Sequence, residues 1–187
     1  MSTLDNPQVE PVNTSPQQTI LRYGGIGGLV LIVYSLLNFV LGLSKPSAGT
    51  FVGFLNIFVV IAIYVFMMIY AVRDHRDNNQ GGYITFGKAF TVAFLTSLLA
   101  ALINTVFTIL YMNVIDPGYV GDIMKASEEF YESSGMPEQQ IEMSLSWAKS
   151  MMEPKGQMIL FLIGTIFGAI ISLIVASSMK KNPPEFQ

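Results

Sequence analysis

The sequence has no cysteine, and this absence excludes several kinds of chemistry. Without thiols the chain forms no disulfide framework, no thiolate metal site and no thiol nucleophile. Histidine is nearly absent too, because His75 is the only one. The segment 73–77 places it among two arginines and two aspartates, which is too small a set of ligands for a metal ion. We therefore expect neither a metal nor another cofactor.

Charge is also scarce. Charged residues make up 12% of the 187 positions, roughly half the usual share of a soluble domain, whereas 51% are hydrophobic. The length suits one compact unit rather than two. The formal net charge of -3 gives no basic surface for nucleic acid, so lipid is the expected environment and partner.

The first nineteen residues contain no basic side chain and three prolines. A secretory signal begins with a positively charged region, so no cleaved signal peptide is expected. The segment has too little apolar surface to offset the entropy of ordering it. We expect residues 1–19 to be a disordered cytoplasmic tail, with a regulatory or docking tail as the alternative. Residues 183–187 would be a second short cytoplasmic tail, and residues 20–182 a single membrane domain.

Four long runs of the sequence contain no Lys, Arg, Asp, Glu or His. They cover residues 23–43, 51–72, 89–115 and 157–179. A helix of about 20 mostly apolar residues crosses a hydrocarbon core of about 30 Å. A soluble helix would keep a polar stripe, whereas residues 51–72 are apolar on every side. The sequence therefore predicts an all-α polytopic membrane protein with four transmembrane helices.

Basic residues flank these runs unevenly. Four spans place both termini and the loop between spans two and three on one side of the membrane. That side carries six basic residues: Arg22, Arg73, Arg76, Lys88, Lys180 and Lys181. The other side carries four: Lys45, Lys125, Lys149 and Lys155. Cytoplasmic loops are richer in Lys and Arg, and the loop R-D-H-R directly after the second run is basic, so we expect both termini in the cytoplasm. Arg73, Arg76 and Lys88 are candidate contacts for lipid headgroups.

The segment 116–156 is the only sizeable part outside the four runs, and it is rich in acidic residues. Asp116 with Pro117 is a typical helix start, and Gly135 suits a helix end. Pro137 opens a second helix, and Pro154 closes it. Each helix has one apolar face at helical spacing. We expect an extracytoplasmic amphipathic helical hairpin between spans three and four.

Two roles are open for this hairpin. It is either a lid, whose apolar face rests on the membrane surface or on the outer span ends with Trp147 at headgroup depth, or a docking surface for a periplasmic partner. The lid is favoured, because an apolar helical stripe is normally buried within its own chain.

Small residues recur at every fourth position in two of the runs. The last run has Gly164, Gly168, Ser172 and Ala176, and the third has Ala89, Ala93, Ser97, Ala101 and Thr105. Such rows let helices approach closely in lipid. We expect the two rows to pack against each other within one subunit. Homodimerisation through either row is the alternative, since the pattern does not say which helix lies opposite.

The other polar features inside the runs suggest packing or a binding pocket rather than catalysis. Four glycines at positions 24, 25, 27 and 28 lie within the first run, not between a strand and a helix, so close packing or a flexible entry explains them better than nucleotide binding. Asn38, Asn56 and Asn104 are expected to bond to one another or to the backbone. No Lys, Arg, Asp, Glu or His lies in the runs, and this argues against a proton relay.

Several stretches resemble a family of small bacterial membrane proteins known as domain of unknown function 4199. They are G-G-Y-I-T-F-G-K-A-F at 81–90, I-D-P-G-Y at 115–119, the segment from Gly135 to Pro154, and I-I-S-L-I-V-A-S-S-M-K-K at 170–181. The resemblance implies a bacterial inner-membrane protein with four spans and a helical segment between the last two. It implies no activity and no catalytic residue.

These observations lead to two hypotheses of function. The first is a non-enzymatic accessory or self-associating envelope component, which forms a homo-oligomer or joins another envelope protein. The second is a carrier or binding protein for a small apolar or lipid ligand, held between the spans near Asn38, Asn56 and Asn104. A continuous internal cavity lined by these asparagines would favour the second.

Overall fold

The computed structural model describes residues 15–182. These residues form six helices longer than one turn and no β-strand. The helices are α1 (Gln17–Val40), α2 (Thr50–Asn79), α3 (Phe86–Leu110), α4 (Tyr119–Ser133), α5 (Glu138–Met152) and α6 (Pro154–Met179). A short 3-10 turn, η1 (Pro46–Ala48), joins α1 to α2, and a π-helical turn, η2 (Tyr111–Ile115), extends α3. Of the predicted tails, residues 1–14 and 183–187 lie outside the described residues. Residues 17–19, which were expected to belong to the first tail, form the start of α1.

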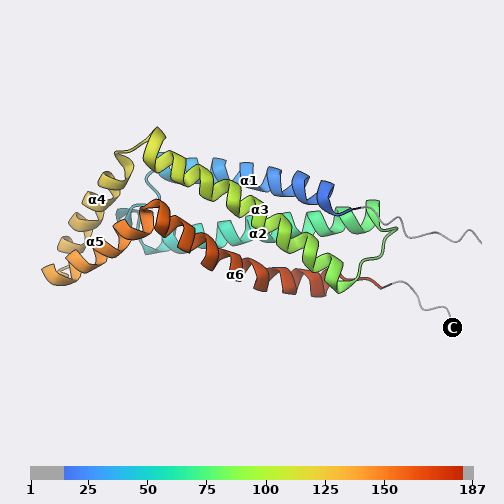
Figure 1. Cartoon of the computed structure of the whole chain (residues 1–187). Helices are drawn as coiled ribbons and strands as arrows, with labels where there is room; N and C mark the ends of the chain where they lie inside the picture. The colour runs from blue at the N-terminus through green and yellow to red at the C-terminus, as the bar shows by residue number, and fades with distance from the viewer. Residues whose placement is uncertain (1–14, 183–187) are drawn as a thin grey trace, which may run out of the picture.

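Four helices, α1, α2, α6 and α3 together with η2, are long and apolar enough to span a membrane. They run side by side, with the α4–α5 hairpin at one end and the α2–α3 connection at the other (Figure 1). We call these the hairpin end and the terminal end, because α1 begins and α6 ends at the latter. Many large apolar side chains on the four helices are exposed, for example Phe51 and Val40. Such a surface suits hydrocarbon and not water, so the chain is a four-span, all-α membrane protein.

Helix α1 packs on α3 through its glycines. A Cβ atom added to Gly24 or Gly28 would lie 2.8 Å from a side-chain carbon of Leu99 or Ile103 on α3. A Cβ atom on Gly27 would lie 1.9 Å from the sulfur of Met67 on α2. Close helix packing therefore explains these three glycines, since the missing side chains let the backbones approach.

The main buried cluster lies toward the terminal end. It joins side chains of α2, α3 and α6 with Ile84 of the α2–α3 connection, and its members are Met68, Ala71, Val72, Ile84, Ala89, Val92, Ala93, Val175 and Ala176. The backbone there is closed by a two-way pairing of Ile84 with Lys181, with both N–H to carbonyl distances 2.9 Å. This pairing fixes the C-terminal end of α6 against the start of α3.

The segment after the second apolar run differs from the expected loop. Arg73 to Arg76 form part of the last turns of α2, which continues to Asn79. Pairs four residues apart support this extension: Arg73 lies 3.7 Å from a carboxylate oxygen of Asp77, and Asn78 donates to Asp74 at 2.8 Å. Such pairs stabilise the exposed end of a helix.

The ends of α4 and α5 agree only in part with the sequence signals. Gly135 follows α4 with φ of +72°, and Pro137 directly precedes α5. However, Asp116 and Pro117 do not open α4, which begins at Tyr119. The backbone N–H of Asp116 instead bonds to the carbonyl of Tyr111, so Asp116 belongs to the end of η2. Pro154 opens α6 instead of closing α5, and only Glu153 separates the two helices. A proline suits the first turn of a helix, where its missing N–H needs no partner.

Helix α4 covers the ends of α1 and α3 with an aromatic cluster. Tyr119 of α4 lies 4.9 Å from Phe39 and 5.7 Å from Tyr111 between ring centroids, and Phe39 and Tyr111 are 4.7 Å apart. Ile123 and Ser127, one and two turns further along α4, are also buried. Burial raises the pKa of the Tyr119 phenol, and its hydrogen bond to Ser44 acts in the opposite direction. The phenol is therefore neutral at physiological pH.

Candidate functional site

The two rows of small residues approach each other only toward the terminal end. Ala93 and Ser97 on α3 are buried, as are Ser172 and Ala176 on α6. A Cβ atom added to Gly168 would lie 3.5 Å from the Ser97 hydroxyl, an ordinary contact distance. Helices α3 and α6 are therefore closely packed at Ala93, Ser172 and Ala176, whereas Ser97 and Gly168 mark the start of a pocket.

Toward the hairpin end the same rows part. A Cβ atom added to Gly164 would have no neighbour within 4 Å, and Ala101 is only half-buried. A pocket of about 340 Å³ occupies this space. The small residues that permit close packing in one half of the membrane therefore form the wall of a pocket in the other.

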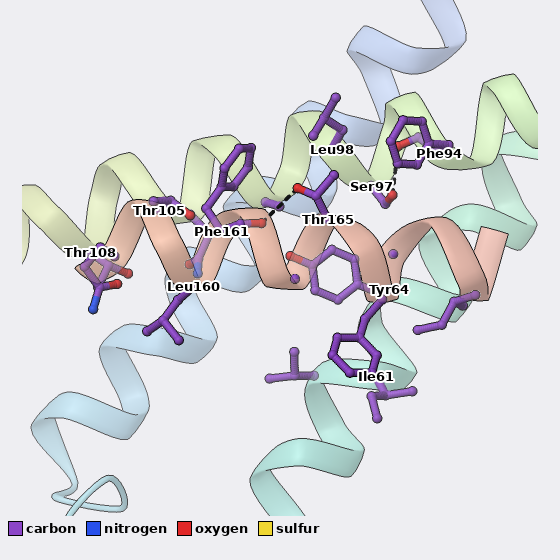
Figure 2. Close-up of a pocket in the computed structure, with 18 residues that line it drawn as sticks. Ile61, Tyr64, Phe94, Ser97, Leu98, Thr105, Thr108, Leu160, Phe161 and Thr165 are labelled. Atoms are coloured by element: carbon purple, nitrogen blue, oxygen red, sulfur yellow. Dashed lines mark hydrogen bonds between the residues drawn. The ribbon is translucent and has the colours of Figure 1, made fainter. Parts of the chain in front are cut away.

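The pocket is bounded by three helices (Figure 2). Helix α3 contributes Phe94, Ser97, Leu98, Ala101, Asn104, Thr105 and Thr108, and α6 contributes Gln157, Leu160, Phe161, Gly164, Thr165, Phe167, Gly168 and Ile171. Helix α2 contributes Val60, Ile61 and Tyr64. In Figure 2, α6 crosses in front of α3, and the side chains of Ile61 and Tyr64 reach toward it from α2.

The lining is mainly apolar, with hydroxyl and amide groups and without any charged residue among those that line it. The hydroxyls of Ser97 and Thr165 donate to the carbonyls of Phe94 and Phe161 on their own helices, each at 2.8 Å (Figure 2). The side-chain oxygen of Asn104 accepts a hydrogen bond from the Ser35 hydroxyl at 3.0 Å. Its amide nitrogen can donate two further hydrogen bonds. The pocket thus offers groups that hold a neutral ligand in place.

The expectation that three asparagines share one site is wrong, because only Asn104 lines the pocket. Asn38 donates to the carbonyl of Tyr34 at 2.8 Å. Asn56 accepts from the Tyr34 hydroxyl and donates to the carbonyl of Leu43 at 3.4 Å. The bonds of Asn56 link α2 to α1 and to the loop before η1, whereas the bond of Asn38 lies within α1. Both asparagines thus bond to groups outside the pocket. Sequence spacing could not separate the two environments, since it does not show which helix each asparagine faces.

The three basic residues expected at lipid headgroups all lie at the terminal end. Arg76 donates to both carboxylate oxygens of Asp77, at 2.7 and 3.2 Å, and the Lys88 ammonium group donates to Gln80 at 3.0 Å. Arg73 is exposed, although it also approaches Asp77. Contact with headgroups remains a prediction for all three.

His75 is the residue that the sequence argument placed wrongly. It is 1% exposed, and its Nδ1 atom lies 3.4 Å from the Thr19 hydroxyl of α1 and 3.4 Å from the Asn79 amide nitrogen. A usable signal was present: His75 continues the buried face of Met68, Ala71 and Val72 at helical spacing. It connects α1 to α2, and no group of three potential metal ligands exists among residues 15–182.

Comparison with known proteins places the chain in a family without an assigned activity. No curated protein and no solved structure matches it. A family model described as "Protein of unknown function (DUF4199)" matches residues 22–181, which include most of α1 and all of the other helices. The chain belongs to this family, the family expected from its sequence.

Proposed function

We propose that this protein is a non-enzymatic binding protein that holds an apolar or lipid molecule in the pocket between α2, α3 and α6. The observation that carries the proposal is the pocket itself. Its volume of about 340 Å³ is within the range of small-molecule sites, roughly 300–1,000 Å³, and its lining has the usual composition of such sites, mostly apolar with a few polar groups.

The location of the pocket supports a ligand drawn from the bilayer. Its walls belong to three of the four candidate spans, at a depth where hydrocarbon and not water is the solvent. Hydroxyls and amides line it, whereas a carboxylate or imidazole that would serve as a general base is not among its lining residues. This set of groups is suited to holding a molecule, so binding is favoured over catalysis.

The proposed setting is the bacterial inner membrane with both termini in the cytoplasm. The six basic residues grouped by sequence flank the terminal end, and the acidic hairpin occupies the opposite end (Figure 1). With the positive-inside rule, we expect the hairpin on the outer side of the membrane and the end of the pocket lined by Thr108 and Gln157 toward the outer surface.

Filling the pocket tests the proposed function. Gly164→Leu adds a side chain where a Cβ atom has open space beside the pocket. We expect this variant to lose a co-purifying lipid in native mass spectrometry while its fold is kept. Gly53→Leu is the matched control, since Gly53 also has open space around it but does not line the pocket. Equal lipid retention by both variants would overturn the proposal.

A second candidate function is association with another copy or another envelope protein, and α5 favours it. Met143 and Trp147 lie one turn apart on α5, and they are 61% and 67% exposed outside the spans. Large exposed apolar side chains of this kind often mark interaction sites. Crosslinking from this face in native membranes tests the association, and covalent adducts with a protein are the expected result.

A further inference from the structure

Polar groups are unevenly distributed along the pocket. Helix α3 runs from the terminal end to the hairpin end, and α6 runs back (Figure 1). Thr108 and Gln157 therefore lie at the hairpin end of the pocket, next to Asn104 and Thr105 within about one turn of α3. Toward the opposite end the lining is mainly apolar, with Phe94, Leu98 and Ile171. Two hydroxyls lie there, those of Tyr64 and Ser97, and the hydroxyl of Ser97 already donates to a carbonyl.

The groups at the hairpin end offer both donors and acceptors. Gln157 donates from its amide nitrogen to the carbonyl of Met151 at 2.9 Å, which leaves its side-chain oxygen to accept. Asn104 accepts from Ser35 through its oxygen, which leaves its amide nitrogen to donate. A ligand group that donates and accepts at once, such as a hydroxyl, is the complement of this pair.

The pocket is also elongated. Its lining runs from Phe94 to Thr108, which are fourteen residues apart on α3, or roughly 21 Å along the helix axis. An extended hydrocarbon chain can therefore lie along the pocket, parallel to the helices.

We infer that the pocket takes an uncharged amphiphile, whose hydroxyl-bearing head lies between Thr108 and Gln157 and whose hydrocarbon chain runs toward Phe94. This inference rests on the proposed function, and it adds the class and the direction of the ligand. A charged head is disfavoured because no charged residue lines the pocket to offset its transfer out of water.

The test compares three photoreactive probes that share one acyl chain and differ in the head: a monoacylglycerol, a fatty acid at a pH where its carboxyl group is ionised, and a lysophosphatidylcholine. The full-length protein is reconstituted in phosphatidylcholine vesicles and the labelled peptides are mapped. We expect the monoacylglycerol to label the pocket about fivefold more than the other two. A photoreactive group at the chain end should label α3 near Phe94, and one next to the head should label α6 near Gln157.

Variants separate the head from the chain. Gln157→Leu with Thr108→Val removes the polar groups of the hairpin end, so we expect the three probes to label equally, with the chain still in the pocket. Gly164→Leu should abolish labelling by every probe, and Gly53→Leu should leave it unchanged.

The outcomes distinguish the inference from the proposed function. Equal labelling of the unmodified pocket by all three probes would overturn the inference and leave the proposed function standing. Labelling near Phe94 by the head-linked group and near Gln157 by the chain-end group would also overturn the inference. No labelling of the pocket by any probe, or a crosslink from the pocket to a second protein chain, would overturn both.

Discussion

Glycine acts in opposite ways at two levels of this bundle. At Gly28 the missing side chain permits contact, because a Cβ atom would lie 2.8 Å from the branched carbon of Ile103. At Gly164 the missing side chain leaves space, and nothing lies within 4 Å. Glycine therefore lies at a close helix contact on α1 and at an open pocket wall on α6. The difference comes from how near the neighbouring helix is at each position.

The glycine contact of α1 predicts a stability difference between neighbouring positions. Gly28→Val forces Ile103 and the backbone of α3 to shift, and we expect a loss of about 2 kcal/mol, in the range of overpacked cores. Gly25→Val is the control, because a Cβ atom at Gly25 meets nothing within 4 Å. Thermal unfolding in mild detergent measures both. If the two variants melted at the same temperature, the α1–α3 contact would be wrong.

At the scale of the elements, the hairpin has two unlike helices. Helix α4 buries Tyr119, Ile123 and Ser127, whereas Ile141 is the one buried residue of α5. Helix α4 packs on the ends of α1 and α3, and the role of the hairpin as a lid stays a prediction. Helix α5 keeps Met143 and Trp147 exposed.

This exposed face predicts position-dependent crosslinking. A photoreactive amino acid at Trp147 should form adducts with a second protein in native membranes if the association described above occurs. Lys149, two residues on and about 200° around the helix, is the matched control on the exposed opposite side. Adducts from Lys149 alone, or lipid adducts alone from Trp147, would contradict a protein partner at this face.

The elements differ in how far the sequence could predict them. Uncharged runs located all four spans, because charge is costly in hydrocarbon, and Gly135 with Pro137 located the turn between α4 and α5. The pocket was not predictable. Rows of small residues permit contact but do not show where two helices diverge, and Asn104 looks like Asn38 until their neighbours are known. The burial of His75 was readable from its spacing, yet its polar neighbours in sequence concealed it.

For the whole molecule, the lack of cysteine makes the orientation directly measurable. Single cysteines at Gln139→Cys on α5 and Asn182→Cys after α6 lie at opposite ends of the bundle and at exposed positions. We expect an impermeant maleimide to label the first in intact cells and the second only after the membrane is opened, because the proposed topology has the basic end in the cytoplasm. The reverse pattern would invert the proposed topology.

The connection of the hairpin has a mechanical consequence for the pocket. Helix α4 follows the end of α3 and is seated on it through Tyr111 and Tyr119, while α5 joins α6 through Glu153 alone. A Cβ atom on Gly156 would lie 2.2 Å from the carbonyl oxygen of Ser150, so the chain turns tightly at this corner. The hairpin thus connects the two principal walls of the pocket through contacts beyond the four spans, and we expect it to limit how far α3 and α6 can separate.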